Sequence, residues 1–237
     1  MTRSMDAQRE VGIVVFPGSN CDQDTIKAVR ELGATPRVLD YRLTELPPLD
    51  RLILPGGFSY GDYLRSGALA AAAPIMDAVD EAALLGMPVL GICNGFQILC
   101  ERGLLPGALL PNPHGTFISQ LETVRVTAVP SGFSGLAVGD HLALPIAHHE
   151  GSYRIAEGQL HALFEQGQVF LQYSDPDGAV HALTNPNGSV ANIAGIASGS
   201  VVGLMPHPER AMAEYLGSAD GRRFLQAWFG QKGSPGC

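Results

Sequence analysis

The sequence predicts an α/β fold in which helices cover both faces of a mostly parallel sheet that carries an added antiparallel portion. Three observations support this prediction. The chain has 237 residues, 46% of them hydrophobic, which is enough for one full core. Its first half alternates short apolar runs with helical spacing, and its second half, after about Pro111, contains strand-like runs separated by turn residues.

The first unit of this alternation is a strand followed by a helix. Residues 11–16 form an apolar run that ends in a Pro-Gly-Ser-Asn turn. Residues 22–32 then place Ile26, Val29 and Leu32 at the spacing of one helix face, and a glycine follows. The segment is therefore predicted to form a strand, a turn and a helix.

The same alternation continues to the middle of the chain. Strands are predicted at residues 37–39, 51–54 and 88–92, and a helix at residues 68–85. Because parallel strands need crossover helices, the alternation implies a sheet covered on both faces, in a flavodoxin-like three-layer αβα sandwich. Functional groups are expected at the carboxyl ends of its strands.

The second half of the chain supplies the antiparallel portion. Strand-like runs lie at residues 121–128, 169–173, 190–196 and 201–205, and the last helix at residues 220–229. No repeat or linker divides the chain, so residues 1–237 are predicted to form a single domain with an ordered core at about residues 11–229. The Gly/Ser/Pro-rich tail from Gly230 is expected to be frayed.

Charge and composition narrow the choice of partners. The formal net charge is −8 and no Lys/Arg-rich run is present, which argues against nucleic acid and anionic membranes because both need a concentrated positive field. The first residues form no apolar signal core, and Pro74 and three acidic residues interrupt the apolar helix at residues 68–85. We therefore expect a cytoplasmic protein outside the membrane whose partners are metabolites or proteins.

Cysteine usage indicates reduced thiols. The four cysteines, Cys21, Cys93, Cys100 and Cys237, are too few for a disulfide framework in a chain of this size. No Cys-x-x-Cys pair indicates zinc, so no metal site is expected.

Cys93 lies between two glycines where an apolar run meets a helical pattern. In a tight strand-to-helix turn the side chains two residues before and two after must be very small, and Gly91 and Gly95 meet that demand. The thiol then gains the partial positive charge of the following helix N-terminus, which favours thiolate. We interpret Cys93 as a nucleophile; for a cysteine taken alone, the alternative is a small buried hydrophobe.

The base for this nucleophile is predicted from a proline-flanked segment. Two prolines keep residues 205–210 extended, so His207 and Glu209 project to the same side. Glu209 can then hold one imidazole nitrogen while the other nitrogen faces sulfur, as in a catalytic triad. The segment follows the predicted strand at residues 201–205, which brings it to the sheet edge of Cys93. A surface turn with an incidental histidine is the other interpretation.

A rival base lies in the triplet His148, His149 and Glu150, which also follows a strand-like run. Consecutive side chains in an extended run point to opposite faces, so the triplet does not present one pair to the thiol. We favour a partner contact or a solvated turn for it over a role in orienting substrate.

A glycine turn after the predicted strand at residues 51–54 is the third candidate site. Attack on a carbonyl creates an oxyanion, and a glycine backbone can aim its N–H there without obstruction by a side chain. Gly57 is the first candidate donor and the Asn94 N–H the second, and Phe58 beside Gly57 belongs to the same oxyanion and substrate-binding set. A tight turn selected only for its shape is the alternative.

Three motifs together resemble the class I, or triad, glutamine amidotransferase family. They are Gly-x-Cys-x-Gly-x-Gln at residues 91–97, Pro-Gly-Gly at residues 55–57 and His-Pro-Glu at residues 207–209. The resemblance covers nearly the whole chain. Four stretches, at residues 55–65, 91–99, 185–189 and 205–210, further resemble the glutaminase subunits of phosphoribosylformylglycinamidine synthases in purine biosynthesis. Three positions, Ser66, Ser119 and His149, depart from the pattern expected of that group.

The resemblance implies the hydrolysis of glutamine to glutamate and ammonia. Cys93 would attack the side-chain amide, His207 would activate the sulfur and protonate the departing ammonia, and water activated by His207 would hydrolyse the γ-glutamyl thioester. By the same resemblance Glu209 would fix the imidazole and Gln97 would help to hold glutamine, although from spacing alone Gln97 could equally pack or cap its helix. Backbone around residues 116–119 is implied for the amino-acid end of the substrate.

The resemblance also implies partner subunits. The chain has no Gly-x-x-x-x-Gly-Lys-Ser/Thr phosphate loop, so no cofactor is expected in it. ATP and Mg²⁺ are assigned to a large synthetase subunit that converts formylglycinamide ribonucleotide to formylglycinamidine ribonucleotide with the ammonia. A small accessory subunit is implied as well. Residues 63–65 and 148–153 are candidate interfaces, and either could equally be ordinary surface.

Other functions stay open at this point. The same chemistry could serve another synthetase, such as those making anthranilate, GMP or imidazole glycerol phosphate, although the stretches at residues 55–62 and 185–189 argue against it. Hydrolases and stress proteins with a similar cysteine elbow often place histidine directly after the cysteine, where this chain has Asn94. A non-catalytic regulatory subunit would not need the complete set of Cys93, His207 and Glu209.

Overall fold

The computed structural model describes residues 9–230, and one mixed sheet dominates them. Cys237, the N-terminal segment tested for a signal core and all but the first residue of the predicted tail lie outside these residues. Within residues 9–230 nine strands form a sheet in the order β2-β1-β3-β4-β11-β10-β9-β6-β7, and β5 and β8 form a separate pair. The strands are β1 (Glu10–Val15), β2 (Thr35–Asp40), β3 (Arg51–Leu54), β4 (Val89–Ile92), β5 (Ala108–Leu110), β6 (Ile118–Val126), β7 (His141–His148), β8 (Ser152–Arg154), β9 (Val169–Tyr173), β10 (Ile193–Ser198) and β11 (Val201–Leu204).

The sheet has a parallel half and an antiparallel half. Strands β2, β1, β3, β4 and β11 pair in parallel, whereas β10, β9, β6 and β7 pair antiparallel. The predicted α/β class is confirmed, and the antiparallel portion continues the same sheet. All four residues of β4 and of β11 are buried, as expected of central strands covered on both faces.

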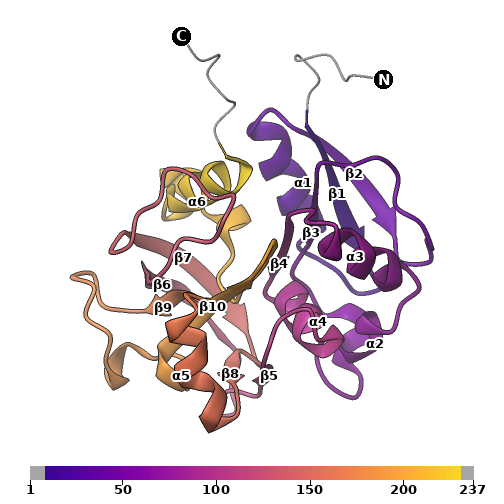
Figure 1. Cartoon of the computed structure of the whole chain (residues 1–237). Helices are drawn as coiled ribbons and strands as arrows, with labels where there is room; N and C mark the ends of the chain where they lie inside the picture. The colour runs from indigo at the N-terminus through magenta and orange to yellow at the C-terminus, as the bar shows by residue number, and fades with distance from the viewer. Residues whose placement is uncertain (1–8, 231–237) are drawn as a thin grey trace.

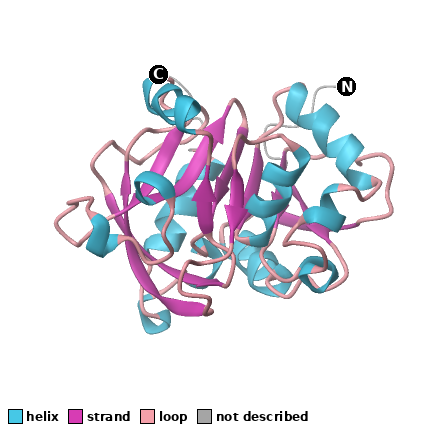
Figure 2. Cartoon of the chain, turned by 90° about the horizontal axis from the view of Figure 1, so that it is seen from below, coloured by secondary structure: helices cyan, strands magenta, loops and turns pink. Residues whose placement is uncertain are grey.

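Helices pack on both faces of the sheet, as Figure 2 shows. They are α1 (Asp22–Glu31), α2 (Ala68–Ala71), α3 (Ile75–Leu84), α4 (Asn94–Arg102), α5 (Glu157–Glu165) and α6 (Asp220–Phe229). In Figure 1 the N-terminal units, drawn in indigo and purple, lie on one side of β4, and the later strands and α6 lie on the other. Within residues 9–230 none of the helices has the length and apolar character needed to cross a membrane.

Two predicted elements needed correction. The single helix predicted at residues 68–85 is two helices, α2 and α3, because Pro74 lacks the N–H that a continuous helix requires and instead stands at the N-terminus of α3. The strand predicted at residues 190–196 begins only at Ile193, after a 3₁₀ turn in which Ala191 has a φ of 50°. The sequence analysis also did not predict α5 or the β5–β8 pair, and it gave no start and end residues for β7.

Strand register brings the predicted motifs to one edge of the sheet. Ile92 at the end of β4 pairs with Leu204 at the end of β11, and Leu54 at the end of β3 pairs with Gly91. Because these strands run parallel, the residues that follow them emerge side by side. The expectation that Cys93 and the segment after β11 share an edge is therefore confirmed.

Candidate active site

Cys93 occupies a strained turn between β4 and α4. Its backbone has φ 50° and ψ −104°, and its side chain is buried. A side chain on Gly95 would overlap the carbonyl oxygen of Leu54, and a Cβ on Gly91 would lie 2.7 Å from the backbone of Gly95. The absence of both side chains is thus what allows the turn, as the sequence predicted for a nucleophile elbow.

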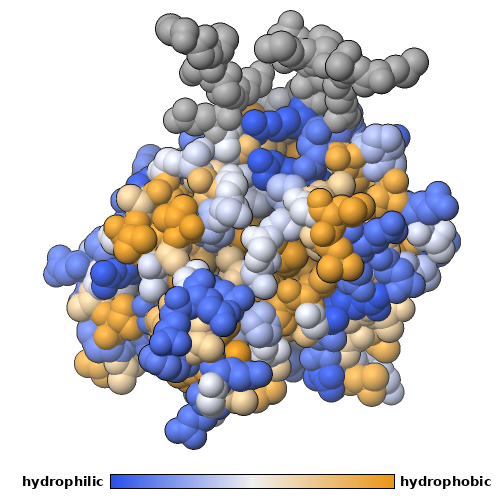
Figure 3. Space-filling view, in the orientation of Figure 1, coloured by the Kyte–Doolittle hydropathy of each residue, from blue (hydrophilic) through white to orange (hydrophobic). Residues whose placement is uncertain are grey.

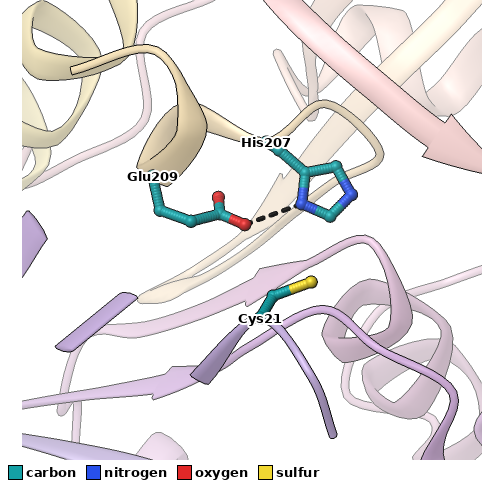
Figure 4. Close-up of side chains that lie close together, drawn as sticks. All are labelled: Cys21, His207 and Glu209. Carbon is teal, nitrogen blue, oxygen red and sulfur yellow. Dashed lines mark hydrogen bonds and ion pairs between the residues drawn. The ribbon is translucent and has the colours of Figure 1, made fainter. Parts of the chain in front are cut away.

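His207 and Glu209 form a buried hydrogen-bonded pair, shown in Figure 4. The His207 Nδ1 and Glu209 Oε1 atoms are 2.7 Å apart, and neither side chain is more than 1% exposed. The backbone N–H of His207 donates to the carbonyl of Pro145 on β7 at 2.8 Å, which fixes the segment after β11. Within residues 9–230 the Nε2 atom of His207 has no hydrogen-bond partner, so it is the nitrogen free to exchange a proton.

The thiol and the imidazole meet around Gly56. A Cβ on Gly56 would lie 2.7 Å from His207 Cε1 and 3.4 Å from Cys93 Cβ, so both side chains border the space that this glycine leaves empty. The Cys93 Sγ atom lies 3.7 Å from the carbonyl oxygen of Ala147 on β7. The structure therefore brings Cys93, His207 and Glu209 into one buried site.

Two opposing effects act on the pKa of His207. Burial alone would lower this pKa, but the Glu209 carboxylate and then the Cys93 side chain raise it well above the ordinary value. The imidazole is thus set to hold a proton beside the sulfur. A proton held there is available to a leaving group.

The glycine turn after β3 lines the same cavity as Cys93. Gly57 has a φ of 144° and forms an isolated bridge with Ser19. Asn94 begins α4, where backbone N–H groups have no partner within the helix. The Phe58 N–H instead donates to the carbonyl of Gly18 at 3.1 Å, so Phe58 contributes its ring and not a free N–H.

Gln97 joins α4 to the loop after β7. Its Nε2 atom donates to the Glu150 carbonyl at 2.6 Å, and its Oε1 accepts from the Asn94 side chain at 2.9 Å. The Asn94 Oδ1 in turn accepts from the Ser59 N–H at 3.2 Å. Gln97 therefore holds three segments of the site together, whatever contact it also makes with substrate.

A cavity of about 200 Å³ opens at the thiol. Its lining includes Gly57, Phe58, Asp62, Cys93, Gln97 and Glu150. Burial raises the pKa of Asp62, and the nearby Glu150 carboxylate adds to this effect against a hydrogen bond from Ser66. Hollows of about 680 and 790 Å³ lie elsewhere, but neither is lined by Cys93, so the smaller cavity is the candidate substrate site.

The rival triplet after β7 divides between interior and surface. His148 is buried, and burial first, then the positive charge of His207, lower its pKa to about 4, so it is neutral at physiological pH and a weak base. His149 is exposed, whereas the backbone and carboxylate of Glu150 bond to Gln97 and to the Ser66 N–H. The triplet lines the cavity and does not form a second base–carboxylate pair.

The segment proposed for the amino-acid end of the substrate lies at the mouth of the site. Thr116 and Ser119 are exposed. The Phe117 ring lies 6.4 Å from the Phe58 ring, centroid to centroid, and Phe58 lines the cavity. No residue from 116 to 119 lines the cavity itself, so the structure places this segment beside the predicted site and not within it.

Sequence reasoning missed Cys21, and it included Asn187 in the stretch at residues 185–189 without giving it a role. Cys21, at the N-terminus of α1, is buried against the triad, and its Sγ accepts a hydrogen bond from Arg210 Nη2 at 2.9 Å. Asn187 is fully buried and donates to the Gly151 carbonyl at 2.9 Å, thereby fixing the loop after β7. Both contacts join residues that are far apart in the chain, so no local spacing in the sequence could predict them.

The Cys21 group has the composition of a metal site. One ligand atom each from Cys21, His207 and Glu209 lies within 4.8 Å of the others, and these are sulfur, nitrogen and oxygen atoms of the kinds that bind zinc. The expectation of no metal site had not considered this cluster. However, the His207–Glu209 hydrogen bond and the Arg210 guanidinium already engage its members.

Comparison with known proteins agrees with this geometry. Residues 8–228 match the model of the CobB/CobQ-like glutamine amidotransferase domain. The phosphoribosylformylglycinamidine synthase subunit PurQ of Thermomicrobium roseum is 53% identical over 217 residues, covering 90% of this chain and 92% of the relative. The subunit of the same name from Chlorobium luteolum is 50% identical over 225 residues, covering 93% and 97%.

A solved structure has the same fold. A chain in the structure of PurLQS from Thermotoga maritima superposes with a TM-score of 0.83 at 39% identity, covering 94% of this chain and 98% of that one.

Proposed function

The chain belongs to the CobB/CobQ-like glutamine amidotransferase family, and we propose that it supplies ammonia as the glutaminase subunit of a phosphoribosylformylglycinamidine synthase. The single observation that carries this proposal is the meeting of the elbow thiol of Cys93 with the buried His207–Glu209 pair at the ends of neighbouring strands. Relatives that match this chain over nearly their full length carry the name of that subunit, which supports a role in de novo purine biosynthesis.

The reaction begins with attack of the Cys93 sulfur on the side-chain amide of glutamine. The carbonyl oxygen becomes an oxyanion, which the Gly57 and Asn94 N–H groups stabilise. The proton on His207 Nε2 passes to the departing ammonia, leaving a γ-glutamyl thioester on Cys93. The neutral imidazole then takes a proton from water as water attacks the thioester; the C–S bond breaks, glutamate leaves, and the sulfur and the protonated His207 return to their starting state.

Glu209 acts through the imidazole. By accepting the Nδ1 proton at 2.7 Å it fixes the tautomer and the plane of the ring, so that Nε2 faces the sulfur. Because the pair is almost completely buried, water does not compete for this hydrogen bond.

The cavity chemistry fits the zwitterionic end of glutamine. The carboxylates of Asp62 and Glu150 belong to its lining, and burial first, then the Glu150 carboxylate, raise the pKa of Asp62. A substrate ammonium group would relieve the repulsion between the two carboxylates. We assign the α-ammonium of glutamine to these carboxylates and the α-carboxylate to the backbone of residues 116–119 at the mouth, where Phe117 lies beside Phe58.

The partner is a synthetase subunit that uses ATP and Mg²⁺, with a small accessory subunit in the same complex. Several large apolar side chains are exposed near the cavity mouth: Phe58, Tyr63, Leu64 and Phe117 are 41%, 72%, 78% and 48% exposed. Tyr63 and Leu64 directly follow Asp62 of the cavity lining. Docking of the synthetase over this rim would bury these side chains and receive ammonia before water protonates it.

On the face shown in Figure 3, apolar side chains form separate patches among polar ones. One patch covers the region of α3, whose C-terminal end carries Leu84 and Leu85, 86% and 82% exposed. The rim is preferred over this patch as the docking surface because only the rim borders the cavity that contains Cys93.

Glutamine hydrolysis tests the proposal directly. Ammonia release should be measured with the chain alone, with the synthetase, and with the synthetase plus ATP, Mg²⁺ and formylglycinamide ribonucleotide; we expect a low rate alone and a higher rate in the full mixture. Equal rates in all three mixtures would contradict coupling to this synthetase and favour an amidotransferase of another pathway.

Covalent labelling separates the enzyme from a regulatory subunit. A diazo-ketone analogue of glutamine should form an adduct at Cys93, located by mass spectrometry of the digested chain. The Cys93→Ala variant should form none. A folded wild-type chain that stays unlabelled in the presence of the synthetase would favour the regulatory role.

A further inference from the structure

Cys21 lies against the triad although it belongs to a distant part of the chain. It stands directly before α1, its side chain is 2% exposed, and its backbone N–H donates to the Gly56 carbonyl at 3.3 Å. A Cβ on Gly56 would lie 3.1 Å from its sulfur and 2.7 Å from His207 Cε1. Figure 4 shows this sulfur directed toward the imidazole on the side away from the protein backbone of His207.

Arg210 is the second member of this arrangement. Its Nη2 atom donates to the Cys21 sulfur at 2.9 Å, and its Nε atom is 3.6 Å from the Asp24 carboxylate on α1. Arg210 directly follows Glu209, and their charges attract each other. The guanidinium is therefore a close neighbour of the carboxylate that holds His207.

Glu209 has an oxygen that could accept this guanidinium. Its Oε1 bonds to His207, but its Oε2 is buried and has no hydrogen-bond partner among the described residues. Guanidinium–carboxylate pairs are charge-assisted, often bidentate and stronger than ordinary hydrogen bonds. An Arg210 side chain released from Cys21, and held otherwise by Asp24 at 3.6 Å, would therefore be drawn to Oε2 and would turn the carboxylate away from His207.

We propose that Cys21 is a positioning residue whose sulfur holds the Arg210 guanidinium away from Glu209, so that the carboxylate remains on His207. The inference rests on the proposed function only in that His207 and Glu209 serve Cys93. Cys21 is not part of the cavity lining, so its effect on glutamine passes through the orientation of the imidazole. The sulfur also fills the space beside Gly56 against which the ring packs.

The test is a set of variants assayed in the complex with the synthetase. Cys21→Ala removes the acceptor, and kcat for glutamine should fall about 10- to 100-fold with KM unchanged, because the triad is displaced without loss of a substrate contact. Arg210→Met removes the competitor, keeps the apolar stem and should cost little. The double variant should return to the rate of Arg210→Met alone.

Matched variants control for packing. Cys100→Ala removes another buried free thiol, on α4, whose only described bond is to the Pro106 carbonyl, and should leave kcat unchanged. Cys21→Ser keeps an acceptor for the guanidinium and should lose less activity than Cys21→Ala. Thermal unfolding of each variant shows whether the chain is folded, and the serine variant keeps the test valid if the alanine variant is not.

A second readout does not depend on glutamine turnover. The rate of Cys93 alkylation by iodoacetamide, followed by mass spectrometry, reports on the thiolate beside His207. In Cys21→Ala the rate at pH 6 relative to pH 9 should fall, because a displaced Glu209 supports the imidazolium less, and Arg210→Met in the same chain should restore it. A purely structural role for Cys21 would lower stability without moving this ratio.

The outcomes separate this inference from the proposed function. Wild-type kcat and an unmoved alkylation ratio in Cys21→Ala would overturn the role of Cys21 and leave the glutaminase intact. A double variant as impaired as Cys21→Ala, or an Arg210→Met variant equally impaired, would also overturn it. If Arg210→Met restores the alkylation ratio of Cys21→Ala but the wild-type complex does not hydrolyse glutamine, the positioning role is supported and the proposed glutaminase function is refuted.

Discussion

The two halves of the sheet contribute to the site in different ways. The parallel half places the reactive groups, because Cys93 follows β4, His207 and Glu209 follow β11, and Gly57 follows β3. The antiparallel half contributes mainly backbone: two carbonyls of β7 contact Cys93 and the His207 N–H. The difference suggests that the parallel half performs the chemistry and that the antiparallel half encloses and stabilises it.

The largest effect is expected from the nucleophile itself. Cys93→Ala should lower kcat for glutamine about 10⁴- to 10⁶-fold, because no other thiol or hydroxyl stands in the elbow. The midpoint of thermal unfolding should change little, since the substitution removes only a sulfur that borders a cavity. A chain that still hydrolyses glutamine would break the assignment of the chemistry to the parallel half; Cys100→Ala is the matched control.

Glu209→Gln should have the next largest effect. An amide has no negative charge with which to hold the imidazole in the correct tautomer. We therefore expect kcat to fall about 10²- to 10⁴-fold while KM for glutamine changes little. Steady-state kinetics at saturating glutamine check this. An equal rise in KM would show that Glu209 also shapes the substrate cavity.

The same variant has a consequence for stability against pH. Because the pKa of His207 is raised in the folded chain, its bound proton contributes stability that is fully present below the ordinary pKa of 6.5 and is lost as pH rises through the higher folded-state pKa. Urea unfolding of wild type and Glu209→Gln across pH 6 to 9 should therefore show a difference in unfolding free energy that shrinks as pH rises.

His148, at the end of β7, tests the antiparallel half. Burial lowers its pKa from 6.5 to about 4. Between these pH values the histidine is protonated in the unfolded chain but neutral in the folded chain, so the folded state loses stability as pH falls. The loss of unfolding free energy reaches about 3 kcal/mol near pH 4. Urea unfolding at pH 7 and pH 4 should show a smaller difference in His148→Gln; parallel curves for the two proteins would contradict the prediction.

Asn187 gives the smallest and most local effect. Asn187→Ala removes the nearer of two buried donors to the Gly151 carbonyl, leaving the Ser189 hydroxyl at 3.2 Å, and should lower the free energy of unfolding by about 2 kcal/mol. The Gln97 side chain also donates to the loop at residues 149–151, at the Glu150 carbonyl, and this loop lines the cavity. KM for glutamine should therefore rise while kcat stays near wild type. Asn185→Ala is the control: it bonds to Ser189 and Asn192 instead, so its KM should not move.

How much the sequence could predict follows the same division. The elbow at Cys93 and the pair at residues 207 and 209 depend on neighbours within two positions, so spacing and backbone rules sufficed. The contact of Cys21 with Arg210 joins residues 189 positions apart and depends on how α1 packs beside the segment after β11. Such a contact leaves no periodic trace in a single sequence.

The helix predicted at residues 68–85 was wrong for a local reason. Residues 68–85 have the composition of one apolar helix, yet Pro74 divides them, which shows a proline effect overriding propensity. The role of Gln97 also depended on tertiary structure, because its amide bonds to a loop 53 positions away. The motif marked the residue, but only the fold revealed what it holds.

The register between β4 and β11 also determines when the site is lost. Ile92 and Leu204 pair within the fully buried centre of the sheet, one residue before the nucleophile and three before its base. Segments of this kind exchange their amide hydrogens only when the whole domain opens, whereas peripheral loops open on their own. On heating, activity should therefore be lost at the same temperature at which the domain unfolds cooperatively. No partly unfolded form in which these two strands have already separated should be populated.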